Sequence, residues 1–217
     1  MTESIKLPNV GELAPYGRGT TFKIPDDVNF IRSASYWDCE SHGSVWFDNG
    51  WNFFGPSWDH IGDCCWTQTK YSFRDKPGAV FSGDPTNGKT KGKACQMIDL
   101  YPNELLRAGI TYGVWSILCF SRIPFGDAAD VFATLQWGED AQKGELFEPS
   151  RCKMAFPLKG KNLTKYIAYI DFRNMDLIYM DANLFGHVRS ADSNGKILME
   201  KMPAFVEYLE TLPSVYD

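Results

Sequence analysis

Two pairs of cysteine and histidine lie close together in the first third of the chain. Cys39 and His42 form a Cys-x-x-His pair, His60 and Cys64 form a His-x-x-x-Cys pair, and seventeen residues separate the two pairs. Structural zinc takes four cysteine or histidine ligands, commonly two from each of two such pairs. The spacing is therefore compatible with a zinc site, whereas the apolar, strand-like chain between the pairs favours ordinary packing and loop roles.

A thiol enzyme is the second chemical hypothesis, because Cys64 follows His60 closely enough for the imidazole to activate the thiol. A nucleophilic cysteine needs a lowered pKa, which a histidine, a lysine or a helix N-terminus can supply. The sequence around Cys64 matches no catalytic cysteine motif, and no third residue stands out that would orient His60. We therefore expect a protein that is not an enzyme, with a zinc-stabilised or cysteine-dependent enzyme as an alternative.

Composition narrows the class of protein and its partners. The chain has 217 residues, 15% of them aromatic, which is typical of a folded globular protein with one core. The net charge of −5 gives no basic footprint, so we expect no nucleic-acid partner. The N-terminal residues lack the pattern of a secretion signal, and no apolar run has the length of a membrane helix. These features predict a cytoplasmic protein whose six cysteines are reduced thiols.

The elements that must position these residues are predicted to be β-strands around one apolar run, Tyr112 to Phe120. This run is too short to span a bilayer and is rich in aromatic and β-branched residues, which favours a strand buried on both faces. The flanking segments, 78–100 and 125–136, are expected to be its neighbours in the sheet, joined by turns rather than helices. Residues 166–172 and 177–181 are predicted to form a hairpin.

Aromatic residues are dense between residues 37 and 66, where short β-like runs alternate with glycines. This pattern favours two or three strands that contribute to a sandwich core. The alternative is an aromatic surface that binds a carbohydrate or another small ligand.

We therefore predict an all-β fold, a two-sheet antiparallel β-sandwich with a C-terminal helical appendage. Residues 1–21 are expected to form an N-terminal arm, residues 22–186 the sandwich, and residues 187–217 an extension packed on it. Within the extension we expect a short turn from Lys196 to Lys201 and a helix from Pro203 to Leu212, because proline suits the first turn of a helix.

The order of short motifs resembles the TerD-type domain, the family of tellurium-resistance and stress proteins. The motifs that carry the resemblance are Trp37-Asp38, Asp48, Ile61-Gly62-Asp63, Ser82-Gly83-Asp84, Asp99-Leu100, Tyr112 to Phe120, Phe125-Gly126, Val131-Phe132-Ala133-Thr134-Leu135, Ala155-Phe156-Pro157-Leu158 and Tyr166 to Ile170. The resemblance covers roughly residues 20 to 185 and implies a β-sandwich that binds calcium.

The resemblance also implies the calcium ligands, which would come from Asp38, Asp48, Asp84 and Asn87 in loops at one end of the sandwich. Calcium takes six to eight oxygen ligands, several of them carboxylates. This sequence departs from the family pattern, because the loop after Asn87 continues with three lysines where the family has acidic residues. The resemblance thus implies a non-enzymatic stress-response binding or scaffold protein with protein partners and a weakened calcium site.

Overall fold

The computed structural model describes residues 16–38, 45–81, 93–128, 130–138, 152–183 and 189–212. These residues form two six-stranded sheets in which every strand pair is antiparallel, so the predicted β-sandwich is confirmed. Sheet A contains, in spatial order, β1 (Thr21–Lys23), β12 (Asp176–Ala182), β11 (Thr164–Asp171), β8 (Tyr112–Cys119), β3 (Phe47–Phe54) and β4 (His60–Cys64). Sheet B contains β10 (Met154–Pro157), β9 (Asp130–Gly138), β2 (Phe30–Asp38), β7 (Lys93–Leu100), β6 (Lys76–Phe81) and β5 (Lys70–Phe73).

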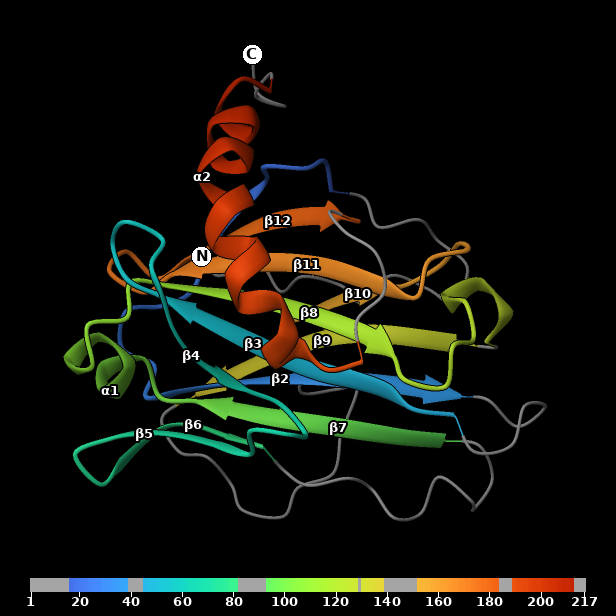
Figure 1. The fold of residues 1–217 in the computed structure, drawn as a ribbon, viewed down its shortest axis with the longest axis horizontal. Coiled ribbons are helices and arrows are strands. Elements are labelled where there is room, and N and C mark those ends of the chain that lie inside the picture. Colours follow the sequence, from blue (N-terminus) through green and yellow to red (C-terminus); the bar gives the residue numbers. More distant parts are fainter. Residues whose placement is uncertain are drawn as a thin grey trace.

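The predicted central strand is β8, which lies in the interior of sheet A between β11 and β3 (Figure 1). Its residues from Gly113 to Cys119 are buried, as expected for a strand covered on both faces. On the side that faces sheet B, the ring of Trp115 stacks on that of Trp51 from β3 at a centroid distance of 5.8 Å. On the other side, Val114 belongs to a second apolar cluster beneath the C-terminal helix.

The predicted sheet neighbours of this strand are wrong. The flanking segments, β7 and β9, both pair with β2 in sheet B, whereas β8 pairs with β3 and β11. The connection between β7 and β8 also contains a short helix, α1 (Pro102–Arg107), where we expected only a turn. The chain therefore crosses from one sheet to the other at α1, and strand periodicity carries no information about such a crossing.

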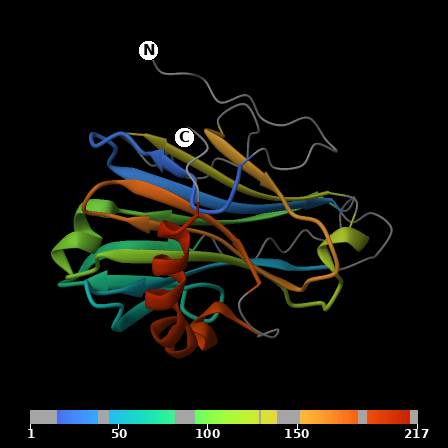
Figure 2. The ribbon, with the colours of Figure 1, turned by 90° about the horizontal axis from the view of Figure 1, so that it is seen from above.

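The C-terminal helix α2 (Gly195–Glu210) covers the outer face of sheet A, as Figures 1 and 2 show. It starts eight residues before Pro203, so the predicted turn from Lys196 to Lys201 is helical and the proline is internal. An internal proline costs a helix about 3 kcal/mol. Leu198 and Met202 lie before the proline and are fully buried. Each contributes roughly 1.5–3 kcal/mol by burial, which offsets that cost.

Close backbone approach fixes the segment before α2 on sheet A. A methyl group added at Gly50 of β3 would lie 2.3 Å from the Cβ of Ala191, which begins the 3-10 helix η3 (Ala191–Asn194). Asn52 on the same face of β3 donates from Nδ2 to the carbonyl of Ala191 at 2.8 Å. The helical appendage is therefore packed on the sandwich by a glycine contact, a hydrogen bond and an apolar face.

The remaining described segments agree with the prediction or extend it. The hairpin of β11 and β12 is confirmed, with its turn at residues 172–175. Residues 16–20, which we expected in an N-terminal arm, run beside β12, where the Gly19 amide donates to the carbonyl of Tyr179 at 2.8 Å. Neither helix within the described ranges is long and apolar enough to cross a membrane.

Candidate functional site

One end of the sandwich collects strand ends from both sheets, and we call it the loop end. In sheet B, β2 ends at Asp38, opposite the first residue of β9, Asp130. In sheet A, β3 begins at Phe47, opposite the last residue of β8, Cys119. The rings of Trp37 and Phe47 contact each other across the core near these strand ends, at a centroid distance of 5.9 Å. The connections at this end are those in which the resemblance placed calcium ligands.

The structure places the predicted calcium ligands apart where it describes them. Trp37 is buried in the core, so its neighbour Asp38 points to the outer face of sheet B, beside its cross-strand partner Asp130. Asp48 lies in sheet A. Asp84 and Asn87 lie outside the described residues. No three acidic, histidine or cysteine side chains gather within the described ranges, so the calcium site stays a prediction.

Among the predicted calcium ligands that the structure describes, Asp48 is buried and hydrogen-bonded to the facing sheet. Its side chain is only 5% exposed, and its Oδ1 accepts a hydrogen bond from Nε2 of Gln96 at 2.8 Å. Gln96 comes from β7 in the facing sheet, and its Oε1 accepts the amide hydrogen of Asn49 at 3.0 Å. Because β4 ends at Cys64, opposite Trp51, no described strand pairs with the start of β3 on that side. The side chain of Gln96 takes the place of the missing strand there.

The structure separates His60 from Cys64. A register shift in the pairing of β3 with β4 at Phe53 and Phe54 puts an extra residue, Ile61, between them. Cys64 consequently packs in the core between the sheets, whereas His60 contacts the ring of Phe54 on the outer face, under α2. Two ligands on opposite faces of a sheet do not share one zinc ion. The other pair, Cys39 and His42, lies outside the described residues.

The thiol of Cys64 is also unsuited to nucleophilic chemistry. It is fully buried, and burial raises its pKa far above the usual range, which keeps it protonated at neutral pH. His60 instead makes a hydrogen bond between its Nε2 and Oδ1 of Asp63 at 2.8 Å. The hydrogen bond to Asp63 raises the pKa of His60. The His60–Cys64 couple of the enzyme hypothesis is therefore not assembled.

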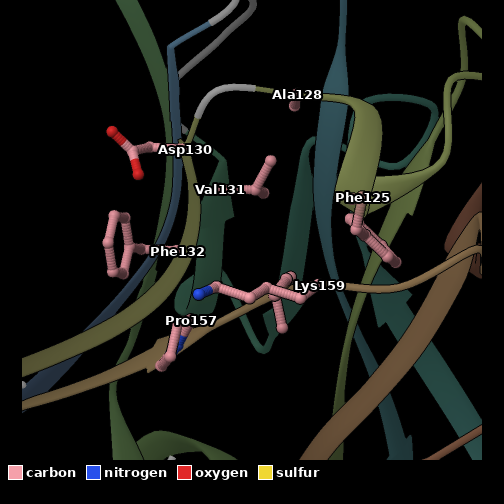
Figure 3. A pocket seen from close by; sticks show the side chains of 9 residues that line it. Phe125, Ala128, Asp130, Val131, Phe132, Pro157 and Lys159 are labelled. Carbon is pink, nitrogen blue, oxygen red and sulfur yellow. The ribbon is translucent and has the colours of Figure 1, made fainter. Parts of the chain in front are cut away.

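A cavity of about 270 Å³ lies at the loop end beside the start of β9. Its lining comes from three segments: Phe125, Gly126 and Ala128 near the 3-10 helix η1 (Phe125–Asp127), Asp130 to Phe132 of β9, and Pro157 to Lys159. Figure 3 shows the side chain of Lys159 reaching across this cavity toward the side on which Phe132 lies. A carboxylate, an ammonium group and aromatic rings thus meet at one opening.

A second, smaller cavity of about 110 Å³ lies at the same end, on sheet A. It is lined by Trp46, Asp48, Trp66 and Phe120, and we call it the aromatic pocket. Trp46 precedes β3, Phe120 follows β8, and Trp66 follows β4, so three connections supply the rings. The carboxylate held by Gln96 is the acidic group of this pocket.

No family model matches this sequence, and no curated protein matches it. The resemblance to the TerD-type domain therefore depends on the short motifs alone, and the function has to be argued from the site.

Part of the aromatic pocket could be predicted from the sequence. Asp48 was expected to bind calcium, and Trp46 and Trp66 belong to the dense aromatic stretch, in which core rings and surface rings look alike. Phe120 was expected to end a buried strand, and Gln96 carries no signal of its own in the sequence. The usable signal was the short spacing of Trp46 and Asp48, which brings a ring and a carboxylate to one place on the chain.

Proposed function

We propose that this protein is a non-enzymatic binding module of TerD-like type that takes its ligand at the loop end. The observation that carries this proposal is the pairing, at that end, of aromatic rings with aspartates in two cavities, one beside Asp130 and one beside Asp48. Side chains that combine a flat apolar surface with a few fixed polar groups are typical of ligand sites. A stress-response or resistance role, and contacts with protein partners, belong to the same proposal through the resemblance.

Calcium is the ligand that the resemblance suggests, and the structure limits how it would bind. Asp38 and Asp48 belong to different sheets, and calcium needs six to eight oxygen atoms. A site at either aspartate would therefore need further oxygens, and the resemblance implies Asp84 and Asn87 as their source. The lysines of that connection lower its affinity for a dication. We accordingly propose weak calcium binding, as a part of the function that can fail without the rest.

Amide chemical shifts and the melting temperature, measured with calcium chloride and with a set of oligosaccharides, test this proposal. A ligand present at a hundred times its dissociation constant stabilises the folded state by about 2.7 kcal/mol, which raises the melting temperature of a chain of this size by roughly 5–11 °C. We expect perturbed amides at the loop end, in residues such as Val131, Phe132 and Phe120.

The matched control lies at the opposite end of the sandwich, where a cavity of about 320 Å³ is lined by Phe73, Arg74, Lys76, Glu104 and Arg107. Phe132→Leu and Phe120→Leu should reduce the response to a loop-end ligand, and Phe73→Leu should leave it unchanged. A response that maps to the Phe73 cavity, or conversion of a ligand into a product, would show that the proposal is wrong. Unchanged spectra in calcium alone would remove only the calcium part.

A further inference from the structure

The cavity of about 270 Å³ beside the start of β9, which we call the Asp130 cavity, presents two opposite charges that do not pair with each other. Its lining contains the carboxylate of Asp130 and the ammonium group of Lys159. Neither side chain makes a hydrogen bond or an ion pair within the described part of the chain. Figure 3 shows Asp130 and Phe132 on one side of β9, with the side chain of Lys159 extending toward that side. Both charges are therefore available to a ligand.

The backbone holds the two charged residues on separate segments. Asp130 begins β9 opposite Asp38 of β2, and Asp38 does not line the cavity. Lys159 follows Leu158, whose amide donates to the carbonyl of Val131 at 2.8 Å. The strand pairing fixes Asp130, and this hydrogen bond fixes the backbone from which Lys159 extends.

The wall formed by η1 is fixed by a close backbone approach. The amide of Gly126 donates to the carbonyl of Gly160 at 2.8 Å, and a methyl group added at Gly126 would lie 3.0 Å from that oxygen. Phe125, the first residue of η1, is buried and stacks on Phe47 at a centroid distance of 5.5 Å. The cavity is thus preorganised, and a site that is shaped before its ligand arrives loses little entropy on binding.

The two charges together select a ligand that carries both signs. A simple cation is attracted by Asp130 and repelled by Lys159, and a simple anion meets the reverse. Asp130 is half-buried, and a carboxylate removed from water needs hydrogen bonds or an opposite charge in exchange. A zwitterion satisfies both groups, because its ammonium group donates to Asp130 and its carboxylate accepts from Nζ of Lys159.

The size and the other walls of the cavity narrow the ligand further. The volume of about 270 Å³ corresponds to about nine water-sized groups, since a water molecule occupies about 30 Å³ in the liquid. This is the size of a small α-amino acid such as leucine. Apolar side chains beside a few fixed polar groups are typical of small-molecule sites. The apolar side chains here are Phe125, Val131, Phe132, Pro157 and Leu158.

We propose that the Asp130 cavity binds a free α-amino acid with a small aliphatic side chain, with its ammonium group at Asp130 and its carboxylate at Lys159. This inference rests on the proposed function and names the ligand class for one of the two loop-end cavities. A residue inside a peptide is excluded as the ligand, because its amino and carboxyl groups are neutral peptide bonds.

The decisive experiment compares leucine with two analogues that each lack one charge. Isoamylamine keeps the ammonium group of leucine, and isocaproate keeps its carboxylate. Calorimetry and amide chemical shifts should show saturable binding of leucine, with perturbed amides at Val131 and Phe132. Both analogues should bind at least about tenfold more weakly, because each loses one charge-assisted hydrogen bond. An analogue that binds as tightly as leucine, or no saturable binding of alanine, valine or leucine up to about 10 mM, would overturn the inference.

Variants locate the site. Asp130→Asn and Lys159→Gln should melt like the natural chain, because neither charge is paired in the structure. Asp130→Asn should weaken leucine and isoamylamine about fivefold or more without weakening isocaproate, and Lys159→Gln should weaken leucine and isocaproate but not isoamylamine. The matched controls are Asp127→Asn and Lys161→Gln, which remove exposed charges that do not line the cavity and should bind leucine like the natural chain. Leucine affinity that is equal in both cavity variants and the natural chain would refute the assignment.

The same experiments separate this inference from the proposed function. If no amino acid binds while calcium or an oligosaccharide perturbs amides at the loop end, the Asp130 cavity is not an amino-acid site and the binding-module proposal stands. If every ligand leaves the loop end unchanged while another surface responds, both are wrong.

Discussion

The buried hydrogen-bond network around Asn49 gives the sharpest test of how the sandwich supports its loop end. Asn49 is fully buried between the sheets. Its Oδ1 accepts the indole hydrogen of Trp115 at 2.7 Å, and its Nδ2 donates to the carbonyl and the Oγ of Ser33, at 3.0 and 3.1 Å. Asn49→Ala removes these three bonds together with a longer one from Nδ2 to the carbonyl of Gln96 at 3.5 Å, and it leaves their partners in an apolar environment.

The loss in free energy of unfolding depends on which partners of Asn49 keep another hydrogen bond in the variant. The Oγ of Ser33 still accepts from the indole of Trp51 at 2.7 Å, whereas the indole hydrogen of Trp115 loses the acceptor that Asn49 provides. A buried donor left unsatisfied costs about 1–3 kcal/mol, and the lost bond to the Ser33 carbonyl adds about 1 kcal/mol. We therefore expect Asn49→Ala to lower the free energy of unfolding by about 3 kcal/mol, out of a total near 5–15 kcal/mol.

Urea unfolding followed by tryptophan fluorescence measures this change, with an unchanged m-value as the sign that only stability is altered. Asn103→Ala is the control, because Asn103 is exposed on α1 and its loss should change stability by less than about 0.5 kcal/mol. Trp115→Phe removes the donor itself. In that background the free-energy cost of Asn49→Ala should be smaller than in the natural chain, by at least about 1 kcal/mol. An additive double-mutant cycle, or a single-variant loss below about 1 kcal/mol, would refute the reasoning.

Three further predictions concern the face beneath α2 and the buried thiol. The hydrogen bond to Asp63 raises the pKa of His60, so its contribution to stability is present below the unfolded value near 6.5 and is lost as the pH rises through the folded pKa. The melting temperature of the natural chain should therefore fall relative to that of His60→Gln between mildly acidic and mildly alkaline pH, and parallel profiles would contradict this. Gly50→Ala places a methyl group against η3 and should cost about 1–3 kcal/mol, with faster hydrogen exchange in α2; Gly17→Ala, which meets no atom within 4 Å, is its control. Cys64 should react with a thiol probe far more slowly in the folded protein than in urea, and a rate equal in both would show that it is accessible.

Local sequence pattern predicted the strands and the class of fold because burial on both faces leaves a mark in the composition. The apolar run from Tyr112 to Phe120 and the hairpin around Met175 are examples, since alternation and turn residues are local properties. The sheet to which a strand belongs, in contrast, could not be predicted from its local sequence pattern. The segments before and after β8 have strand patterns as clear as its own, yet they lie in the other sheet, because the chain crosses between the sheets at α1 and again in the connection from β8 to β9.

Tertiary contacts also overrode local rules at two residues, Pro203 and Ile61. Pro203 would end a helix on intrinsic preference, and the apolar face that α2 buries on sheet A outweighs it. Ile61 shifts the register of β4, so the His-x-x-x-Cys spacing that suggests a shared ligand places His60 and Cys64 on opposite faces. A single bulged residue is invisible in the hydrophobic pattern, so the sequence could not show that these two side chains point away from each other.

The shortness of β4 connects the architecture with the proposed site. If β4 continued beyond Cys64, it would pair with the start of β3 and extend sheet A beside the aromatic pocket. Because it stops, the chain turns at residues 65–68, where the Cys65 amide donates to the carbonyl of Gln68 at 2.9 Å, and Oε1 of Gln96 from the other sheet accepts the amide hydrogen of Asn49 at the edge of β3. An interrupted edge normally exposes unpaired backbone groups, which invites another strand to add. Here Gln96 accepts a backbone hydrogen at that edge, and the aromatic pocket lies beside it, where three connections bring Trp46, Trp66 and Phe120 next to Asp48.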